Sequence, residues 1–157
     1  MFFQLFFTYR VPETGRGGDN SVFKIAAKLQ QLYGYSVFVA EGNIQVGDNW
    51  TNAITHALRN CEAVVVMCSE TYGDDELSPW TGCELAMAAN AKKLLLPVWH
   101  SGPYPPQAAE LVLSNKHRVP IGNTGYVEAN ISHERIAKDL AFALMKKGIL
   151  PLGQPQR

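Results

Sequence analysis

Short apolar segments alternate with amphipathic helical segments along the chain. The apolar segments cover residues 3–9, 36–40, 63–69, 94–99 and, more weakly, 118–121. Two of them contain the continuous runs Val64–Val66 and Leu94–Leu96, which are typical of parallel strands that helices cover on both faces. The order of elements therefore predicts an α/β domain with a doubly wound, five-stranded parallel sheet.

The helical segments show apolar residues with a period near 3.6. They cover residues 22–32, 50–61, 79–91 and 132–147. Ser78 and Pro79 are typical of a helix start, and Ser132 is the expected N-cap of the last helix. Asp48 or Asn49 is the expected cap of the second helix.

The composition predicts one domain over residues 1–150 and a flexible tail over residues 151–157. Of the 157 residues, 46% are hydrophobic, enough to build a core. Lys plus Arg and Asp plus Glu are 14 each, so the chain lacks the basic excess of a general nucleic-acid binder. No run approaches the ~18 apolar residues of a membrane span. The apolar opening has no basic leader or cleavage site and is expected to form a buried strand.

Cysteine and histidine positions argue against a metal site. Cys61, Cys68 and Cys83 form no C-x-x-C pair, which favours a reduced, cytoplasmic compartment. The four histidines are scattered without ligand spacing. We therefore expect no metal and no disulfide framework.

Glu84 is the candidate for chemistry. It lies one turn after Trp80 on a helical face that is otherwise apolar or small. An inward carboxylate needs a partner or an open cleft. A role in complementing the helix dipole is less favoured, since that effect fades after the first turn. The spacing alone leaves a functional and a structural role equally open.

Two loops are candidates for ligand or partner contacts. The loop over residues 41–50 has two glycines and places Ile44 and Val46 outside any strand. It is either a lid or docking segment, or an ordinary connection. The Gly-rich loop over residues 14–20 is either a phosphate cradle with Arg16 or a flexible surface loop. The second interpretation is favoured because no phosphate-loop motif is present.

Four segments in this order resemble the sequence boxes of the TIR (Toll/interleukin-1 receptor homology) domain. They are Phe6–Arg10, Glu41–Trp50, Ser69–Leu85 with its W-x-x-x-E from Trp80 to Glu84, and Leu94–Val98. The resemblance implies a flavodoxin-like fold. Residues 130–134 also resemble the segment before the last helix of the animal NAD-cleaving enzyme. Enzymatic members of the family cleave NAD+ at the nicotinamide–ribose bond, and the motif places their catalytic glutamate on Glu84.

The resemblance therefore implies an NAD+ glycohydrolase or cyclase that acts in innate-immune or cell-death signalling. NAD+ is its substrate, and no cofactor is implied. Besides the catalytic Glu84, the implied site residues are the substrate-binding Tyr9, Arg10, Gly47 and Trp80 and the interaction-loop residues Ile44, Gln45, Val46 and Asp48. Homotypic TIR–TIR self-association and membership of a larger receptor or adaptor chain are also expected.

Two alternatives remain. The first is a non-enzymatic TIR scaffold or adaptor that acts by homotypic assembly, favoured by the apolar loop residues Ile44 and Val46. The second is a flavodoxin-like nucleotide-binding protein, which the missing phosphate loop makes the weakest of the three.

Overall fold

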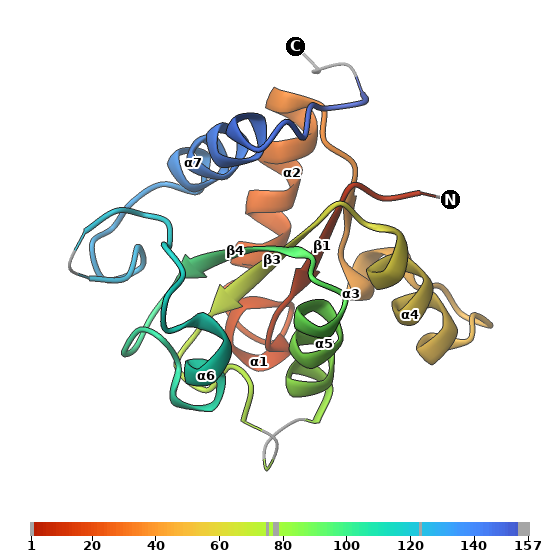
Figure 1. The fold of residues 1–157 in the computed structure, drawn as a ribbon, viewed down its shortest axis with the longest axis horizontal. Helices are drawn as coiled ribbons and strands as arrows, with labels where there is room; N and C mark the ends of the chain where they lie inside the picture. The colour runs from red at the N-terminus through yellow and green to blue at the C-terminus, as the bar shows by residue number, and fades with distance from the viewer. Residues whose placement is uncertain (1, 75, 77–78, 123, 154–157) are drawn as a thin grey trace.

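The computed structural model describes residues 2–74, 76, 79–122 and 124–153, and its chain alternates strands with helices (Figure 1). The strands are β1 (Leu5–Thr8), β2 (Val37–Phe38), β3 (Ala63–Cys68) and β4 (Leu94–Trp99). The helices are α1 (Val11–Thr14), α2 (Ser21–Tyr33), α3 (Ala40–Asn43), α4 (Trp50–Asn60), α5 (Pro79–Asn90), a 3-10 turn η1 (Gln107–Ala109), α6 (Glu110–Leu113) and α7 (His133–Lys146). Among these described helices, none is long and apolar enough to cross a membrane.

The strands form one parallel sheet. In the described chain it has four strands in the order β2-β1-β3-β4. Every residue of β1 and β3 is buried, which agrees with the continuous apolar runs seen in the sequence. The doubly wound parallel architecture predicted from the sequence is thus confirmed.

The prediction of a fifth strand over residues 118–121 is wrong. That segment makes a single bridge, in which the Val119 N–H donates to the Pro97 carbonyl at 3.0 Å and the Trp99 N–H donates to the Val119 carbonyl at 2.8 Å. Pairing stops there because the next outward acceptor, the Trp99 carbonyl, takes the N–H of Tyr126 instead. Ile121 is left 90% exposed.

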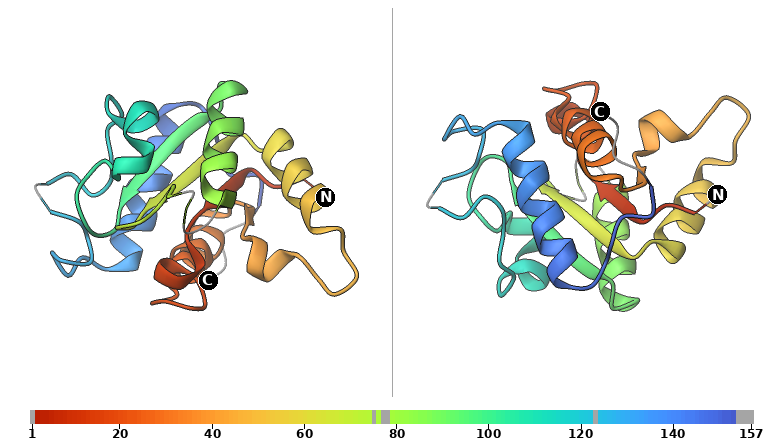
Figure 2. Two further views of the ribbon diagram at one scale, coloured as in Figure 1. Left: turned by 90° about the horizontal axis from the view of Figure 1, so that it is seen from below. Right: turned by 90° about the horizontal axis from the view of Figure 1, so that it is seen from above.

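Two apolar layers cover the two faces of the sheet. On one face α2 and α7 lie side by side over β1 and β3, with Ile25, Leu29, Leu140 and Leu144 buried between them and the sheet (Figure 2). On the other face α4, α5 and α6 contribute a second buried cluster that includes Leu58. Helices on both faces explain why the central strands are apolar throughout.

Two of the predicted helix caps are confirmed. The Asn49 side chain accepts the N–H of Asn52 at 2.9 Å, and the Ser132 hydroxyl accepts the N–H of Arg135 at 3.1 Å. The proposed cap of α5, Ser78, lies outside the described residues, and the helix itself begins at Pro79.

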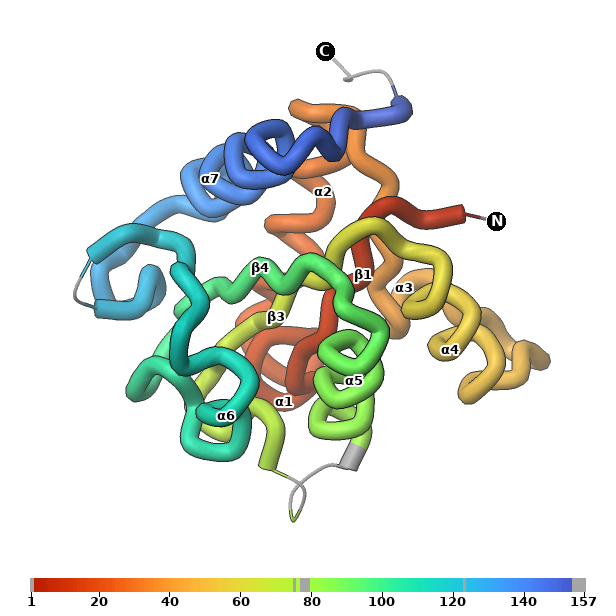
Figure 3. The backbone as a smooth tube through the Cα atoms, in the orientation of Figure 1, coloured from red at the N-terminus to blue at the C-terminus, as the bar shows by residue number. Residues whose placement is uncertain are grey.

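The buried side chain of Gln4 joins the beginning of the chain to residues 150–152. Figure 3 traces the backbone between these two segments, from red to dark blue. Its amide nitrogen donates to the carbonyl of Leu150 at 2.8 Å, and its amide oxygen accepts the N–H of Leu152 at 3.2 Å. The N–H of Gly153 donates to the carbonyl of Gly34 at 2.9 Å. Leu152 and Gly153, which belong to the expected tail, are therefore hydrogen-bonded to the body of the domain.

The strand order fixes where a ligand can approach. In the sheet, β1 lies next to β3. The connection after β1 leads to α2 on one face, and the connection after β3 leads to α5 on the other face. A crevice therefore opens at the carboxyl ends of these two strands. The segment after β1, α3 after β2 and the start of α5 after β3 all meet at this crevice.

Truncating a leucine of the α7 layer is expected to destabilise the domain. Leu140 is fully buried, so Leu140→Ala should lower the free energy of unfolding by about 2–5 kcal/mol in urea titrations. Leu111 is 99% exposed, and the matched change Leu111→Ala should stay within about 0.5 kcal/mol of the parent. Equal losses for the two variants would contradict this account of the core.

Candidate functional site

A cleft of about 300 Å³ opens at the carboxyl edge of the sheet. It is bounded by the segment after β1, by α3, by the first turns of α4 and by the first turns of α5. Its lining residues are Phe7, Tyr9, Arg10, Val11, Pro12, Ala40, Glu41, Trp50, Ile54, Trp80, Thr81 and Glu84. Of the residues predicted for catalysis and substrate binding, Tyr9, Arg10, Trp80 and Glu84 come together here, whereas Gly47 is not among the lining residues.

Glu84 lies in the second turn of α5 with only 7% of its surface exposed. Leu85 and Ala88 of the same helix are buried against the sheet, and this packing holds Glu84 next to the end of β1. The Thr8 hydroxyl donates to Glu84 Oε1 at 2.8 Å. Burial raises the pKa of the carboxyl from 4.5 to about 7, and the hydrogen bond from Thr8 partly opposes that rise.

A second buried hydroxyl supports this contact. The Tyr72 hydroxyl lies 2.8 Å from Thr8 Oγ1, and both residues are fully buried. Thr8 has one hydroxyl proton, so when it donates to the Glu84 carboxylate its oxygen is free to accept from Tyr72. Burial holds the pKa of Tyr72 well above its ordinary value, which keeps its proton available. Neither Thr8 nor Tyr72 was among the residues predicted for the site.

Glu41 also lines the cleft and was missed as a site residue. Its Oε1 accepts the Tyr9 hydroxyl at 2.8 Å and the backbone N–H of Arg16 at 3.3 Å. Burial and the neighbouring Glu41 raise the pKa of Tyr9, so the phenol stays protonated. A Cβ at Gly15 would lie 2.3 Å from the same Glu41 oxygen and 2.8 Å from the Tyr9 ring, so a larger residue at this position would displace the Tyr9–Glu41 pair.

The Gly-rich loop is closed by its own backbone rather than open to a phosphate. The N–H groups of Gly18 and Asn20 both donate to the carbonyl of Gly15, at 3.0 and 3.1 Å. Asp19 Oδ2 lies 2.7 Å from His100 Nε2 and so ties the loop to the end of β4. Burial alone would raise the Asp19 pKa, yet hydrogen bonds from His100 and Ser21 hold it below its ordinary value. Two of the donors that a phosphate cradle would need are thus already used.

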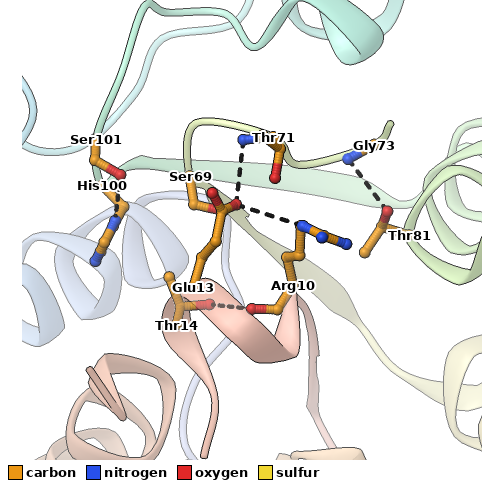
Figure 4. A network of polar contacts seen from close by, with 9 residues as sticks. All are labelled: Arg10, Glu13, Thr14, Ser69, Thr71, Gly73, Thr81, His100 and Ser101. Carbon is orange, nitrogen blue, oxygen red and sulfur yellow. Dashed lines mark hydrogen bonds and ion pairs between the residues drawn. The ribbon is translucent and has the colours of Figure 1, made fainter. Parts of the chain in front are cut away.

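Arg10 brings a cation to the cleft. Figure 4 shows its side chain beside Glu13, close to Ser69 and Thr71. The Arg10 side chain is 12% exposed, and its Nε lies 3.8 Å from Glu13 Oε1. The same Glu13 oxygen accepts the Ser69 hydroxyl at 2.6 Å and the Thr71 N–H at 3.1 Å. Glu13 therefore shares its charge among several donors. Arg10 Nε has no hydrogen-bond partner among the described residues.

Two tryptophans contribute exposed aromatic surface to the cleft. Trp80 from α5 is 43% exposed, and Trp50 from α4 is 44% exposed. Trp50 follows the apolar stripe of its helix in the sequence, yet its ring is half-exposed. It is the first residue of α4, before the turns where Ile54 and Leu58 pack against the sheet.

The predicted interaction loop lies apart from the cleft lining. Val46 is fully exposed, and Gly47 has a φ of +93° with open space around its Cβ position. Asp48 Oδ2 accepts the backbone N–H of Gln45 at 2.7 Å and closes the turn. Ile44, expected to be exposed, is half-buried against the apolar cluster that α4 covers. Only Val46 of the two apolar loop residues is thus free at the tip.

A metal centre has no support in the described part of the chain. There, no group of three or more His, Cys, Asp or Glu side chains gathers closely enough to hold an ion. The ionisable groups of the cleft are instead one buried carboxyl, a second carboxyl bonded to a phenol, and a guanidinium. Such a set favours recognition of a polar organic ligand with an anionic part.

Comparison with known proteins agrees with this architecture. The TIR domain family model matches residues 16–133, a range that includes Glu84 and excludes Tyr9 and Arg10. The TIR domain of the Toll-related receptor TRR-2 from Hydra magnipapillata is similar at 12% identity and a TM-score of 0.55, over 94% of this chain and 98% of that one. The TIR domains of the activated Roq1 resistosome are similar at 14% identity and a TM-score of 0.52, over 92% of this chain and 74% of that one. No curated protein matches the chain.

The buried carboxyl makes folding stability depend on pH. Near pH 4 Glu84 is protonated in the folded and the unfolded chain. Between its ordinary pKa of 4.5 and the folded value of about 7, only the unfolded chain releases the proton, so stability falls as the pH rises. Glu84→Gln removes this loss and should raise the free energy of unfolding at pH 8 by on the order of 3 kcal/mol.

Urea unfolding at pH 4 and pH 8 measures this difference. Near pH 4 the Glu84→Gln variant should match the parent. Glu128 is exposed, and the control Glu128→Gln should show no pH-dependent gain. If Glu84→Gln raised the free energy of unfolding by the same amount at both pH values, the difference between the Glu and Gln side chains would come from packing and not from ionisation.

Proposed function

This chain belongs to the TIR domain family, which includes NAD+ nucleosidases and signalling adaptors, and we propose that it is one of the nucleosidases. It would cleave the nicotinamide–ribose bond of NAD+ to give nicotinamide and either ADP-ribose or its cyclic form. Self-association would activate it in innate-immune or cell-death signalling. The observation that carries the proposal is the buried carboxyl of Glu84 in a cleft that also contains a cation and aromatic side chains.

Glu84 would act on the charge that develops during bond cleavage. When the C–N bond breaks, its electron pair leaves with nicotinamide and the ribose acquires oxocarbenium character. An ionised carboxylate beside the ribose stabilises that cation more than it stabilises the ground state, and burial strengthens the effect. Water then adds to the anomeric carbon and releases a proton to solvent, or a nucleophile within the substrate closes the ring.

The rest of the cleft would orient the dinucleotide. Trp80 and Trp50 offer half-exposed rings for stacking against nicotinamide or ribose. Arg10 offers N–H donors to the pyrophosphate, since Glu13 is shared with other donors. At about 300 Å³ the cleft lies at the small end of ligand pockets, so it would hold the nicotinamide–ribose half and leave the adenosine half outside.

The scaffold alternative rests on a different observation. Val46 is fully exposed at the tip of the loop, next to Gly47 with its positive φ. An isolated apolar side chain on such a tip suits insertion into a partner. In this interpretation the loop drives assembly, and Glu84 has only a structural role.

Nicotinamide release by purified protein tests the proposal. Incubation with NAD+ at high protein concentration, with and without a crowding surface, should release nicotinamide that chromatography detects. Glu84→Gln keeps the shape and removes the charge, so release should fall by ~100-fold or more. The matched control Glu128→Gln, at an exposed position, should keep parent activity.

The same experiment separates the alternative. Absence of release in every condition, together with concentration-dependent assembly that Val46→Asp abolishes, would contradict the enzyme and favour the scaffold. Val46→Asp is preferred to a change at Ile44, because Ile44 packs against the core and its loss would disturb folding. Full activity of Glu84→Gln would reject the mechanism while leaving another nucleosidase mechanism open.

The contact between Thr8 and Glu84 predicts how activity responds to pH. If the ionised carboxylate is the active form, release should rise with pH through the Glu84 pKa of about 7. Thr8→Val keeps the side-chain shape but removes the hydroxyl that favours ionisation. The midpoint of the profile should then move to higher pH, by roughly one to two units.

Initial rates measured from pH 5 to pH 9 at limiting NAD+ provide this midpoint. Thr124→Val serves as the control, since Thr124 is exposed and not among the residues that line the cleft. A lower rate in Thr8→Val with an unchanged midpoint would show that Thr8 contributes only to packing.

A further inference from the structure

A second hollow lies at the outer edge of the sheet, away from the cleft. It has a volume of about 870 Å³ and is bounded by β4, by residues 115–121 and by α7. In Figure 1 β4 is the last strand of the sheet on this side, with α7 above it. We call this hollow the β4 groove. The predicted fifth strand would have filled it, but that segment pairs with β4 only at Val98.

In the described part of the chain, nothing pairs with the outer edge of the first half of β4, which faces the β4 groove. Pro97 and Trp99 use their backbone groups to bind Val119 on the outer side. Because backbone groups alternate in direction along a strand, Leu95 directs its N–H and C=O to the same outer side, and Leu96 directs its own toward β3. An open edge of this kind is a template for an added strand.

Positive charge is concentrated around this edge. Half of the chain's 14 Lys and Arg residues line the β4 groove, whereas Asp139 is its only acid among the described residues. Asp139 is already paired with Arg135 at 3.1 Å. Lys116 and Lys146 form no ion pair with any described acid. A chain with zero net charge thus carries a strongly cationic surface at one place.

The β4 groove also presents apolar surface. Leu94, Leu95 and Leu96 line its floor from the strand, with Leu95 and Leu96 only 8% and 9% exposed. Ile121 and Phe142, on the two sides, are 90% and 60% exposed. Neutralising a polyanion needs neither an apolar lining nor a free strand edge. A peptide with alternating acidic and apolar side chains uses the edge, the lining and the charge together.

We propose that the β4 groove binds an extended acidic segment of a partner protein, which adds as a strand beside Leu94–Leu96. Main-chain hydrogen bonds to Leu95 give the register. The apolar side chains of the segment face the groove lining, and its carboxylates lie near lysines such as Lys116 and Lys146. This interaction is independent of the cleft that contains Glu84.

Fluorescence anisotropy with a labelled peptide of alternating Glu and Val tests the proposal. The parent protein should bind this peptide, and binding should weaken as salt increases. The double charge reversal Lys116→Glu and Lys146→Glu should weaken binding by about tenfold or more. A matched control, Lys24→Glu with Lys138→Glu, changes the net charge equally at exposed positions outside the groove and should bind as the parent does.

Amide hydrogen exchange tests strand addition itself. The bound peptide should slow exchange at the Leu95 N–H, whereas the Leu96 N–H, directed toward β3, should change little. Equal binding of a peptide with clustered rather than alternating Glu, without protection at Leu95, would overturn strand addition.

Competing occupants give distinct outcomes that also overturn the proposal. The parent could bind a single-stranded oligonucleotide or phosphatidylserine vesicles more tightly than the peptide and lose this binding in the Lys116 and Lys146 double variant. The β4 groove would then be a nucleic-acid or membrane surface. Self-association that the same variant abolishes, without peptide binding, would make it an interface between copies of this chain.

Discussion

The arrangement of the cleft depends on one carboxyl held out of water against the end of β1. An ionised carboxylate at 7% exposure loses much of its hydration, and the Thr8 hydroxyl replaces only part of it. The remaining imbalance appears as a pKa of about 7. The elements that keep water away are the buried residues of α5 and the sheet, so the property belongs to the fold and not to Glu84 alone. A looser contact between α5 and β1 would hydrate the group and return it to an ordinary acid.

The central strands and the amphipathic helices could be predicted because their burial produces recognisable apolar patterns. A strand that is buried on both faces is apolar throughout, and a helix that is buried on one side has an apolar stripe. Continuous apolar runs such as Val64–Val66 are typical of strands that helices cover on both faces, and the caps Asn49 and Ser132 act within their own turns. The fifth strand could not be predicted correctly, because its pairing was decided by competition between distant partners. The N–H of Tyr126 donates to the carbonyl of Trp99, and the sequence of residues 118–121 contains no sign of this contact.

The residues of the candidate site likewise fall into those that a local pattern reveals and those that only the topology brings together. Glu84 stood out because a carboxylate on an apolar helical stripe is a local anomaly. Thr8 and Tyr72 lie 64 positions apart, and their hydroxyls approach each other only because β1 and β3 are neighbours in the sheet. Glu41 was hidden because its partners, Tyr9 and the Arg16 backbone, come from the segment after another strand. Contacts of this kind follow from topology, so a sequence pattern gives the elements that meet but not the atoms that pair.

Net charge illustrates the limit of a composition argument. Equal numbers of acids and bases describe the average field far from the molecule, whereas recognition depends on the field within about one Debye length of the surface. In this chain half of the basic residues gather beside the outer edge of β4, where the backbone groups of Leu95 are available to pair with an added strand. Lysines at an edge repel other cationic edges and attract acidic ones. The same charges that protect the edge from unspecific pairing therefore select the chemistry of a partner that can approach it.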